Sequence, residues 1–105
     1  MTLALSMNEN LNRLMSGGIT ILDFIATWSR PCRAQRRIIS AFERKARGSA
    51  TVKQLNIDEY RDLALRLGIQ SIPTIIFFKD GKEASRLIGL QPLEALTDVL
   101  QSLTN

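Results

Sequence analysis

The run Ile19–Ile25 constrains the fold more than any other part of this sequence. It reads Ile-Thr-Ile-Leu-Asp-Phe-Ile and consists almost wholly of β-branched or apolar residues. Its length is typical of a strand, and its lack of polar alternation is typical of a strand buried on both faces. Such a strand needs a covering layer on each side of its sheet, which indicates an α/β architecture. Asp23 is the anomaly, because a buried carboxylate must find partners or keep its proton.

The rest of the chain alternates helix and strand patterns. Besides the central strand, the patterns predict helices over residues 6–16, 32–46, 58–67 and 92–103, strands over 51–57, 74–78 and 83–88, and an edge strand at 2–5. We expect Asp58 to cap the third helix, and Asp80-Gly81 to form the turn of a hairpin. This order predicts a mixed sheet of four to five strands flanked by four helices.

The helix expected over residues 32–46 is amphipathic and strongly basic. Its apolar positions are Ala34, Ile38, Ala41, Phe42 and Ala46. Seven cations stand against Glu43 between residues 30 and 47, namely Arg30, Arg33, Arg36, Arg37, Arg44, Lys45 and Arg47. That segment therefore carries a net charge of +6, while the remainder of the chain nets −2. The cations form either a solvated face or a surface for an acidic partner; nucleic acid is disfavoured because no base-stacking aromatic residues accompany them.

Composition excludes several chemistries. The 105 residues suffice for one domain, residues 1–105, and 45% hydrophobic with 23% charged residues is ordinary for a folded chain. The absence of histidine excludes Ser-His triads, Cys-His pairs and histidine metal sites. A single cysteine, Cys32, excludes an intramolecular disulfide and a cysteine-only zinc site. We therefore expect neither a metal nor a cofactor.

Hydropathy favours a soluble, cytoplasmic protein. No apolar run reaches about 18 residues, the length that a membrane-spanning helix needs. The first residues lack the cationic and apolar regions of a secretory signal, so the cytoplasm is the expected compartment.

Five spaced motifs resemble the thioredoxin family. They are Leu22-Asp23-Phe24, Trp28-Ser29-Arg30-Pro31-Cys32, Ile72-Pro73-Thr74, Phe78-Lys79-Asp80-Gly81 and the single Gly89. The resemblance runs from about residue 19 to residue 103 and keeps the order and spacing of the family. It implies the thioredoxin fold, protein disulfide or dithiol substrates, and an electron donor of the thioredoxin reductase type.

The resemblance departs from the family at its centre. Thioredoxins carry Trp-Cys-Gly-Pro-Cys, and here Ser29 stands at the first cysteine and Arg30 at the glycine. In the family a thiolate at a helix N-terminus attacks a substrate disulfide, and the second thiol resolves the mixed disulfide. By resemblance, Cys32 holds the place of the resolving thiol and Asp23 that of the carboxylate that moves its proton. Serine forms no disulfide, so the dithiol cycle cannot run in this chain.

The resemblance also implies a partner groove. Its residues would be Trp28, Arg30, Pro31, Ile72, Pro73 and Gly89. In thioredoxins the proline of this loop is cis and lies opposite the active-site helix, where the preceding residue pairs with an extended substrate segment. Gln54 stands where the family usually has a lysine, so less positive charge opposes a raised pKa of Asp23.

Two functions remain open. The first is a dithiol protein-disulfide reductase in which serine has replaced the nucleophilic cysteine at position 29. The second is a natural redox-inactive or monothiol module that holds a partner without turnover. Without the resemblance, Cys32 would be interpreted as a small buried hydrophobe, and Asp23 would be equally consistent with a functional residue and with a capped or salt-bridged strand residue.

Overall fold

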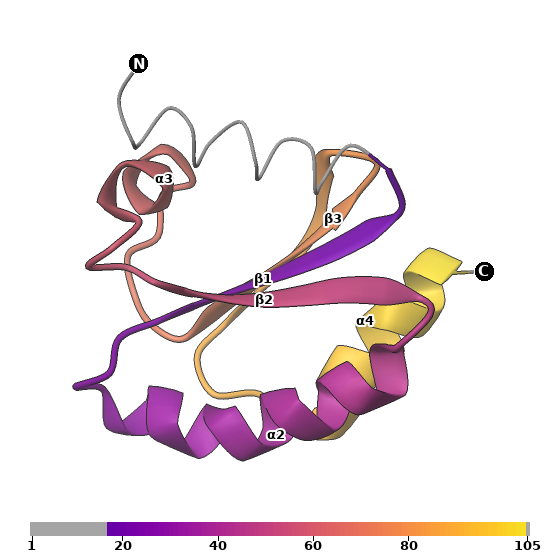
Figure 1. Cartoon of the computed structure of the whole chain (residues 1–105), viewed down its shortest axis with the longest axis horizontal. Helices are drawn as coiled ribbons and strands as arrows, with labels where there is room; N and C mark the ends of the chain where they lie inside the picture. Colours follow the sequence, from indigo (N-terminus) through magenta and orange to yellow (C-terminus); the bar gives the residue numbers. More distant parts are fainter. Residues whose placement is uncertain (1–16, 105) are drawn as a thin grey trace.

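The computed structural model describes residues 17–104, which form a mixed sheet between two helical layers (Figure 1). The elements are β1 (Ile19–Ile25), α2 (Arg30–Ala46), β2 (Ala50–Asn56), α3 (Arg61–Arg66), β3 (Thr74–Lys79), β4 (Lys82–Ile88) and α4 (Leu93–Thr104). The strand order is β2-β1-β3-β4; β1 pairs in parallel with β2 and antiparallel with β3, and β3 pairs antiparallel with β4. The edge strand at 2–5 and the helix at 6–16 that the sequence predicts lie outside the described residues.

β1 is a central strand, as its composition predicts, and is buried along nearly its whole length. Because side chains alternate along a strand, Ile19, Ile21 and Asp23 point to one face of the sheet, and Leu22 and Phe24 to the other. In Figure 1, α2 and α4 lie below the sheet and α3 lies above it. Asp23 therefore belongs to the face that α2 and α4 cover.

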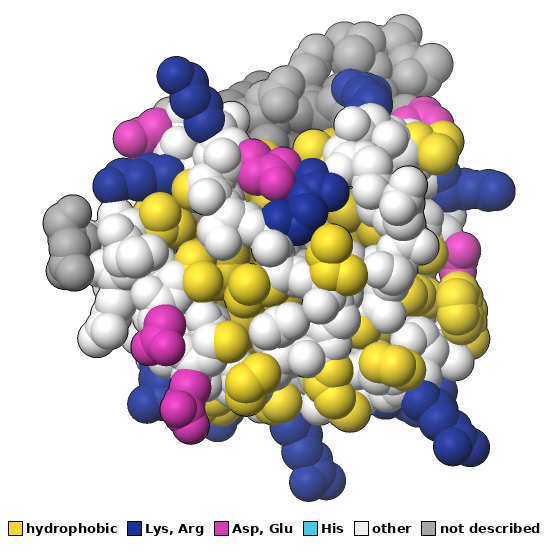
Figure 2. Space-filling view, turned by 180° about the vertical axis from the view of Figure 1, so that it is seen from behind, with side chains coloured by type: hydrophobic (Ala, Val, Ile, Leu, Met, Phe, Trp, Pro, Cys, Tyr) yellow, Lys and Arg dark blue, Asp and Glu magenta, His cyan; other side chains and the backbone are white. Residues whose placement is uncertain are grey.

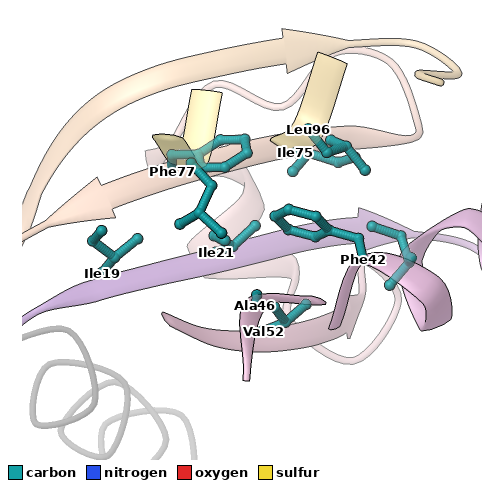
Figure 3. Packing of buried hydrophobic residues seen from close by; sticks show 10 residues of the cluster. Ile19, Ile21, Phe42, Ala46, Val52, Ile75, Phe77 and Leu96 are labelled. Carbon is teal, nitrogen blue, oxygen red and sulfur yellow. The ribbon is translucent and has the colours of Figure 1, made fainter. Parts of the chain in front are cut away.

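The larger hydrophobic cluster fills the space between the sheet and the pair α2 and α4 (Figure 3). Its buried members are Ile19, Ile21, Ile39, Phe42, Ala46, Val52, Ile75, Phe77, Leu96 and Leu100. The rings of Phe42 and Phe77 meet edge to face, with centroids 6.2 Å apart and planes at 64°. This contact joins the C-terminal half of α2 to β3 across the core.

A smaller cluster holds α3 on the opposite face of the sheet. Its buried members are Leu22, Phe24, Leu55, Ala64, Ile76 and Phe78. The helix ends in a Schellman motif at Gly68, whose φ of 68° is left-handed, because Gly68 N donates to Leu65 O and Ile69 N donates to Ala64 O. The short helix is thus fixed by its C-terminus and by its apolar side.

The predicted hairpin forms between β3 and β4. Asp80 and Gly81 have φ angles of 52° and 83°, the pair of positive values that a type I′ turn requires. The Asp80 carboxylate accepts a hydrogen bond of 2.9 Å from Gly18 N, and Asp80 N donates to Gly18 O at 2.8 Å. The turn is therefore anchored to the residue that precedes β1.

The inward face of α2 differs from the predicted one. Ala34 is exposed, while Gln35 and Ile39 are buried. The buried side chains are Cys32, Gln35, Ile39, Phe42 and Ala46. Their spacing of three and four residues places them on one stripe of the helix. The buried face therefore follows the helical period, even though it includes the polar Gln35.

The predicted cap of α3 is wrong. The helix begins at Arg61, with Tyr60 at the N-cap position and no side-chain cap. Asn56 organises the preceding turn instead, because its Oδ1 accepts from Asp58 N at 2.9 Å. Glu59 N and Tyr60 N both donate to Asn56 O. An asparagine side chain that bonds the backbone two residues ahead starts a turn, and this turn delays the helix past Asp58.

Candidate active site

Ser29 is the N-cap of α2. Its backbone is extended, with φ −88° and ψ 125°, and its Oγ accepts a hydrogen bond of 3.3 Å from Cys32 N. Ser29 N in turn donates to Ala26 O at 3.2 Å, which closes the connection from β1. Pro31 lies in the first turn, where its missing N–H leaves no intrahelical bond unmade. The side chain at position 29 thus points at the free amide groups of the helix.

Cys32 begins the buried stripe of α2 and has only 5% of its surface exposed. Its thiol is free. Because α2 follows β1 through a short connection, its N-terminal turn lies at the carboxyl end of that strand, where Asp23 is found. Cys32 and Asp23 accordingly lie in the same layer, between α2 and the sheet.

Asp23 is fully buried. Within residues 17–104 its Oδ2 accepts one hydrogen bond, at 3.3 Å, from Gln54 Nε2 on β2, and its Oδ1 accepts none. Burial raises the pKa of Asp23 to about 6, and the Gln54 hydrogen bond opposes that rise. The alternative that Asp23 is a salt-bridged strand residue is wrong, because no cation within residues 17–104 pairs with it.

The loop before β3 meets the loop after β4. The Ile72–Pro73 peptide bond is cis, Pro73 is buried and Ile72 is half-buried. Pro73 O accepts a hydrogen bond of 2.8 Å from Gly89 N. Gly89 has a φ of 88°, in the left-handed region that favours glycine. The two loop residues that the resemblance assigns to the groove are therefore in direct contact.

The thioredoxin family model matches residues 3–102. The chain belongs to the thioredoxin family. Thioredoxin from Chlamydia caviae is 36% identical over 88 residues, which is 84% of this chain and 85% of that protein. Thioredoxin from Staphylococcus haemolyticus is 33% identical over 93 residues, or 89% of each.

Solved structures confirm the thioredoxin fold. A mutant thioredoxin from Halobacterium salinarum superposes with a TM-score of 0.85 at 28% identity, covering 92% of this chain and 85% of that one. Fasciola hepatica thioredoxin has the same fold, with a TM-score of 0.83 at 24% identity over 94% of this chain and 93% of its own.

Exposed apolar side chains surround the thioredoxin motif and the Gly89 loop. Trp28 is 67% exposed, and Ile88 and Leu90, on either side of Gly89, are 62% and 51% exposed. Figure 2 shows hydrophobic side chains spread over the middle and lower part of the face turned away in Figure 1, with Lys and Arg as well as Asp and Glu side chains around them. Arg30 and Pro31 are also exposed. Trp28, Ile88 and Leu90 therefore present apolar side chains to solvent.

The outer face of α2 is basic toward both of its ends. The exposed cations are Arg30, Arg33, Arg36, Arg37, Arg44 and Lys45, followed by Arg47 at the C-cap. None of them forms an ion pair within the part of the chain that the structure describes. Arg33 Nη1 donates to Thr27 O at 3.3 Å. No carboxylate of the described residues therefore neutralises this positive charge.

Gln35 is the site residue that sequence reasoning missed. It is completely buried, and its amide bonds the backbone of Gln91, in the loop between β4 and α4. The signal that could have found it is its position, three residues after Cys32 and four before Ile39, on the same helical stripe.

The described residues offer no metal site and no membrane span. Across residues 17–104 no group of three His, Cys, Asp or Glu side chains could hold a metal ion. No helix in that range is long and apolar enough to cross a bilayer.

Proposed function

We propose that this chain is the scaffold of a thioredoxin-type protein-disulfide oxidoreductase in which Ser29 stands in place of the nucleophilic cysteine. The carrying observation is the hydrogen bond from Cys32 N to Ser29 Oγ. It supports the view that a side-chain atom at position 29 occupies the place where a helix N-terminus stabilises negative charge. A thiol at that position would have its pKa lowered below about 8.5.

The proposed reaction of the cysteine-containing parent has two exchange steps. The thiolate at position 29 attacks one sulfur of a substrate disulfide, forms a mixed disulfide and releases the other substrate sulfur as a thiolate. The Cys32 thiolate then attacks the sulfur at position 29 and releases the second substrate thiol. The substrate gains two electrons and the protein is left with a 29–32 disulfide, which an external dithiol or a reductase-type donor reduces.

Asp23 would act on the second step as a proton acceptor. Its pKa of about 6 leaves it mostly ionised at neutral pH, and its Oδ1 has no competing hydrogen-bond partner among the residues that the structure describes. A buried carboxylate of this kind can take the proton of a nearby thiol, directly or through one water, as that thiol becomes the attacking thiolate. Its full burial in the layer between α2 and the sheet supports this role.

The proposed partners are protein disulfides or dithiols and a thioredoxin reductase-type electron donor, since the relatives of this chain are thioredoxins. The groove would consist of Trp28, Arg30, Pro31, Ile72, Pro73 and Gly89. The unpaired cations of α2 favour partners with an acidic surface around the disulfide, because opposite charge speeds association. A cytoplasmic location and a single domain over residues 1–105 stay predictions.

A natural monothiol or redox-inactive binding module is the second candidate. The observation that favours it is the exposure of Trp28, at 67%, and of Leu90, at 51%, which leaves an apolar surface for a partner without any thiol at position 29. Ser29 also satisfies the helix cap without a thiol. This candidate predicts binding without turnover.

The Ser29→Cys variant separates the two candidates. We expect it to form a 29–32 disulfide and to catalyse dithiothreitol-dependent reduction of insulin, while the unchanged chain shows almost none. The double variant Ser29→Cys, Cys32→Ser is the control, and should form mixed disulfides that are not resolved. A Ser29→Cys protein that folds and forms the disulfide but reduces no protein disulfide would overturn the oxidoreductase proposal.

A further inference from the structure

Gln35 is a polar side chain in an apolar layer. It has no exposed surface and shares the inward stripe of α2 with Cys32, Ile39, Phe42 and Ala46. Burying an amide without hydrogen bonds costs free energy, so its presence there calls for partners. Both of its polar atoms have one, and both partners belong to a single residue 56 positions further along the chain.

That residue is Gln91, in the loop between β4 and α4. Gln35 Nε2 donates to Gln91 O at 2.9 Å, and Gln91 N donates to Gln35 Oε1 at 2.7 Å. A planar amide that bonds both the N–H and the C=O of one backbone residue fixes its distance and its orientation together. The side chain therefore ties this loop to α2, one turn beyond Cys32.

A second anchor lies two residues earlier in the same loop. Gly89 N donates to Pro73 O at 2.8 Å, and the Gln91 side chain donates from Nε2 to Ile88 O at 3.1 Å. Leu90 stands between the two anchors with 51% of its surface exposed. Its backbone is thus fixed on one side by the loop before β3 and on the other by α2, while its side chain is open to solvent.

We infer that Gln35 is a positioning residue that fixes the loop 89–91 and thereby presents Leu90 to an apolar side chain of an extended partner segment. This inference rests on the proposed function, because the partner segment is the one that carries the disulfide. Gln35 itself touches no substrate. Its effect passes through the backbone of Gln91 and changes how well the partner is held, not the exchange chemistry at positions 29 and 32.

The first test uses the unchanged chain and needs no activity. Gln35→Met keeps the length of the side chain and removes both hydrogen bonds; Ile39→Val, one turn further along the same stripe, is the matched control for a core change that leaves the loop alone. We expect amide hydrogen exchange at Gln91 to become at least about tenfold faster in Gln35→Met and to stay within about twofold in Ile39→Val. Unchanged protection of Gln91 in a folded Gln35→Met protein would overturn the inference.

The second test adds the Ser29→Cys background. There we expect Gln35→Met to raise KM for insulin by about fivefold or more, with kcat and the rate of reduction of a small aromatic disulfide within about twofold. If Gln35 had a purely structural role, Gln35→Met would lower the reduction rates of insulin and of the small disulfide by the same factor. If Ser29→Cys is active and has the same KM for insulin with and without Gln35→Met, the proposed function stands and the inference about Gln35 is overturned. If Ser29→Cys is inactive on both substrates, the proposed function fails. The hydrogen exchange rate of the Gln91 amide then still tests whether Gln35 fixes the loop 89–91.

Discussion

Gln54 Nε2 lies 3.3 Å from Asp23 Oδ2 and provides the one hydrogen bond that this carboxylate receives within residues 17–104. The two residues face each other across the parallel pair β1 and β2. A neutral amide stabilises a buried carboxylate less than a cation would, so desolvation dominates and the pKa of Asp23 rises to about 6. The burial of Asp23 beside a neutral amide therefore raises the proton affinity of the candidate site and makes the free energy of unfolding depend on pH.

Asp23→Asn should stabilise the protein at pH 7. The raised pKa means that the unfolded carboxyl ionises first as the pH rises, while the folded one keeps its proton. The contribution of Asp23 to the free energy of unfolding is therefore highest below about pH 4 and falls between about pH 4 and 6. By pH 7 it is lower by about 3 kcal/mol. Urea unfolding from pH 4 to pH 7 should show this slope in the unchanged chain and a much flatter one in Asp23→Asn.

Gln54→Lys tests how a neighbouring cation changes the pKa of the same carboxylate. A cation beside Asp23 should lower its pKa toward the ordinary value near 4, and an NMR titration of the Asp23 carboxyl carbon would measure the change. A normal pKa for Asp23 in the unchanged chain would contradict the desolvation argument. So would a pKa that does not respond to the lysine.

Ser29→Ala should destabilise the protein by about 1 kcal/mol. The variant removes the Oγ that accepts from Cys32 N and leaves that amide without its side-chain partner. Ser29→Asp is the control, since a carboxylate can cap the same amide and also interacts favourably with the helix dipole. Denaturant midpoints compare the three proteins, and an Ala variant as stable as the parent would show that the cap contributes nothing.

Charge reversal on the outer face of α2 should slow partner association. Replacing Arg30, Arg33 and Arg36 by glutamate is expected to lower the association rate with an acidic partner by about tenfold or more at low salt, and the difference should shrink as salt rises. The control reverses Lys53, Arg61 and Arg66, which are exposed on β2 and α3. Stopped-flow association would measure both sets, and equal rates would reject the electrostatic part of the proposal.

Asn56→Ala should cost about 1 kcal/mol, while Asp58→Ala should change stability by less than about 0.5 kcal/mol. Asn56 Oδ1 accepts from Asp58 N, and α3 starts beyond Asp58 without a side-chain cap. Thermal unfolding of the two variants would compare them directly. A larger loss of stability in Asp58→Ala than in Asn56→Ala would indicate that Asp58 caps α3 after all and would contradict this account of the turn.

Local signals predicted the fold where the cause itself is local. The composition of Ile19–Ile25 requires burial on both faces, and Asp80-Gly81 supplies the two positive φ angles of the hairpin turn. The cap at Asp58 failed because two neighbouring residues can start competing turns, and a sequence does not show which backbone amide each side chain will bond.

The least predictable part of the site depends on contacts between distant residues. A glutamine in an arginine-rich helix is normally solvent-facing, and nothing near Gln35 in the sequence indicates that its partner is Gln91. The contact between Pro73 and Gly89 is of another kind, because it continues the antiparallel pairing of β3 and β4, in which Thr74 lies opposite Ile88. The pairing of Gln35 with Gln91 follows from the packing of α2 and α4 onto one face of the sheet, and hydropathy predicts only that such a helical layer exists.

β1 lies between two paired strands, and this position couples the ionisation of Asp23 to the cooperative unfolding of the protein. Its amides are bonded within the sheet to β2 on one side and β3 on the other, and both of its faces are covered. Strands of this kind exchange their amide hydrogens only when the entire structure opens. Because Asp23 belongs to this strand and its carboxyl has a raised pKa, a change of pH shifts the free energy of this global opening and leaves the surface loops comparatively unaffected.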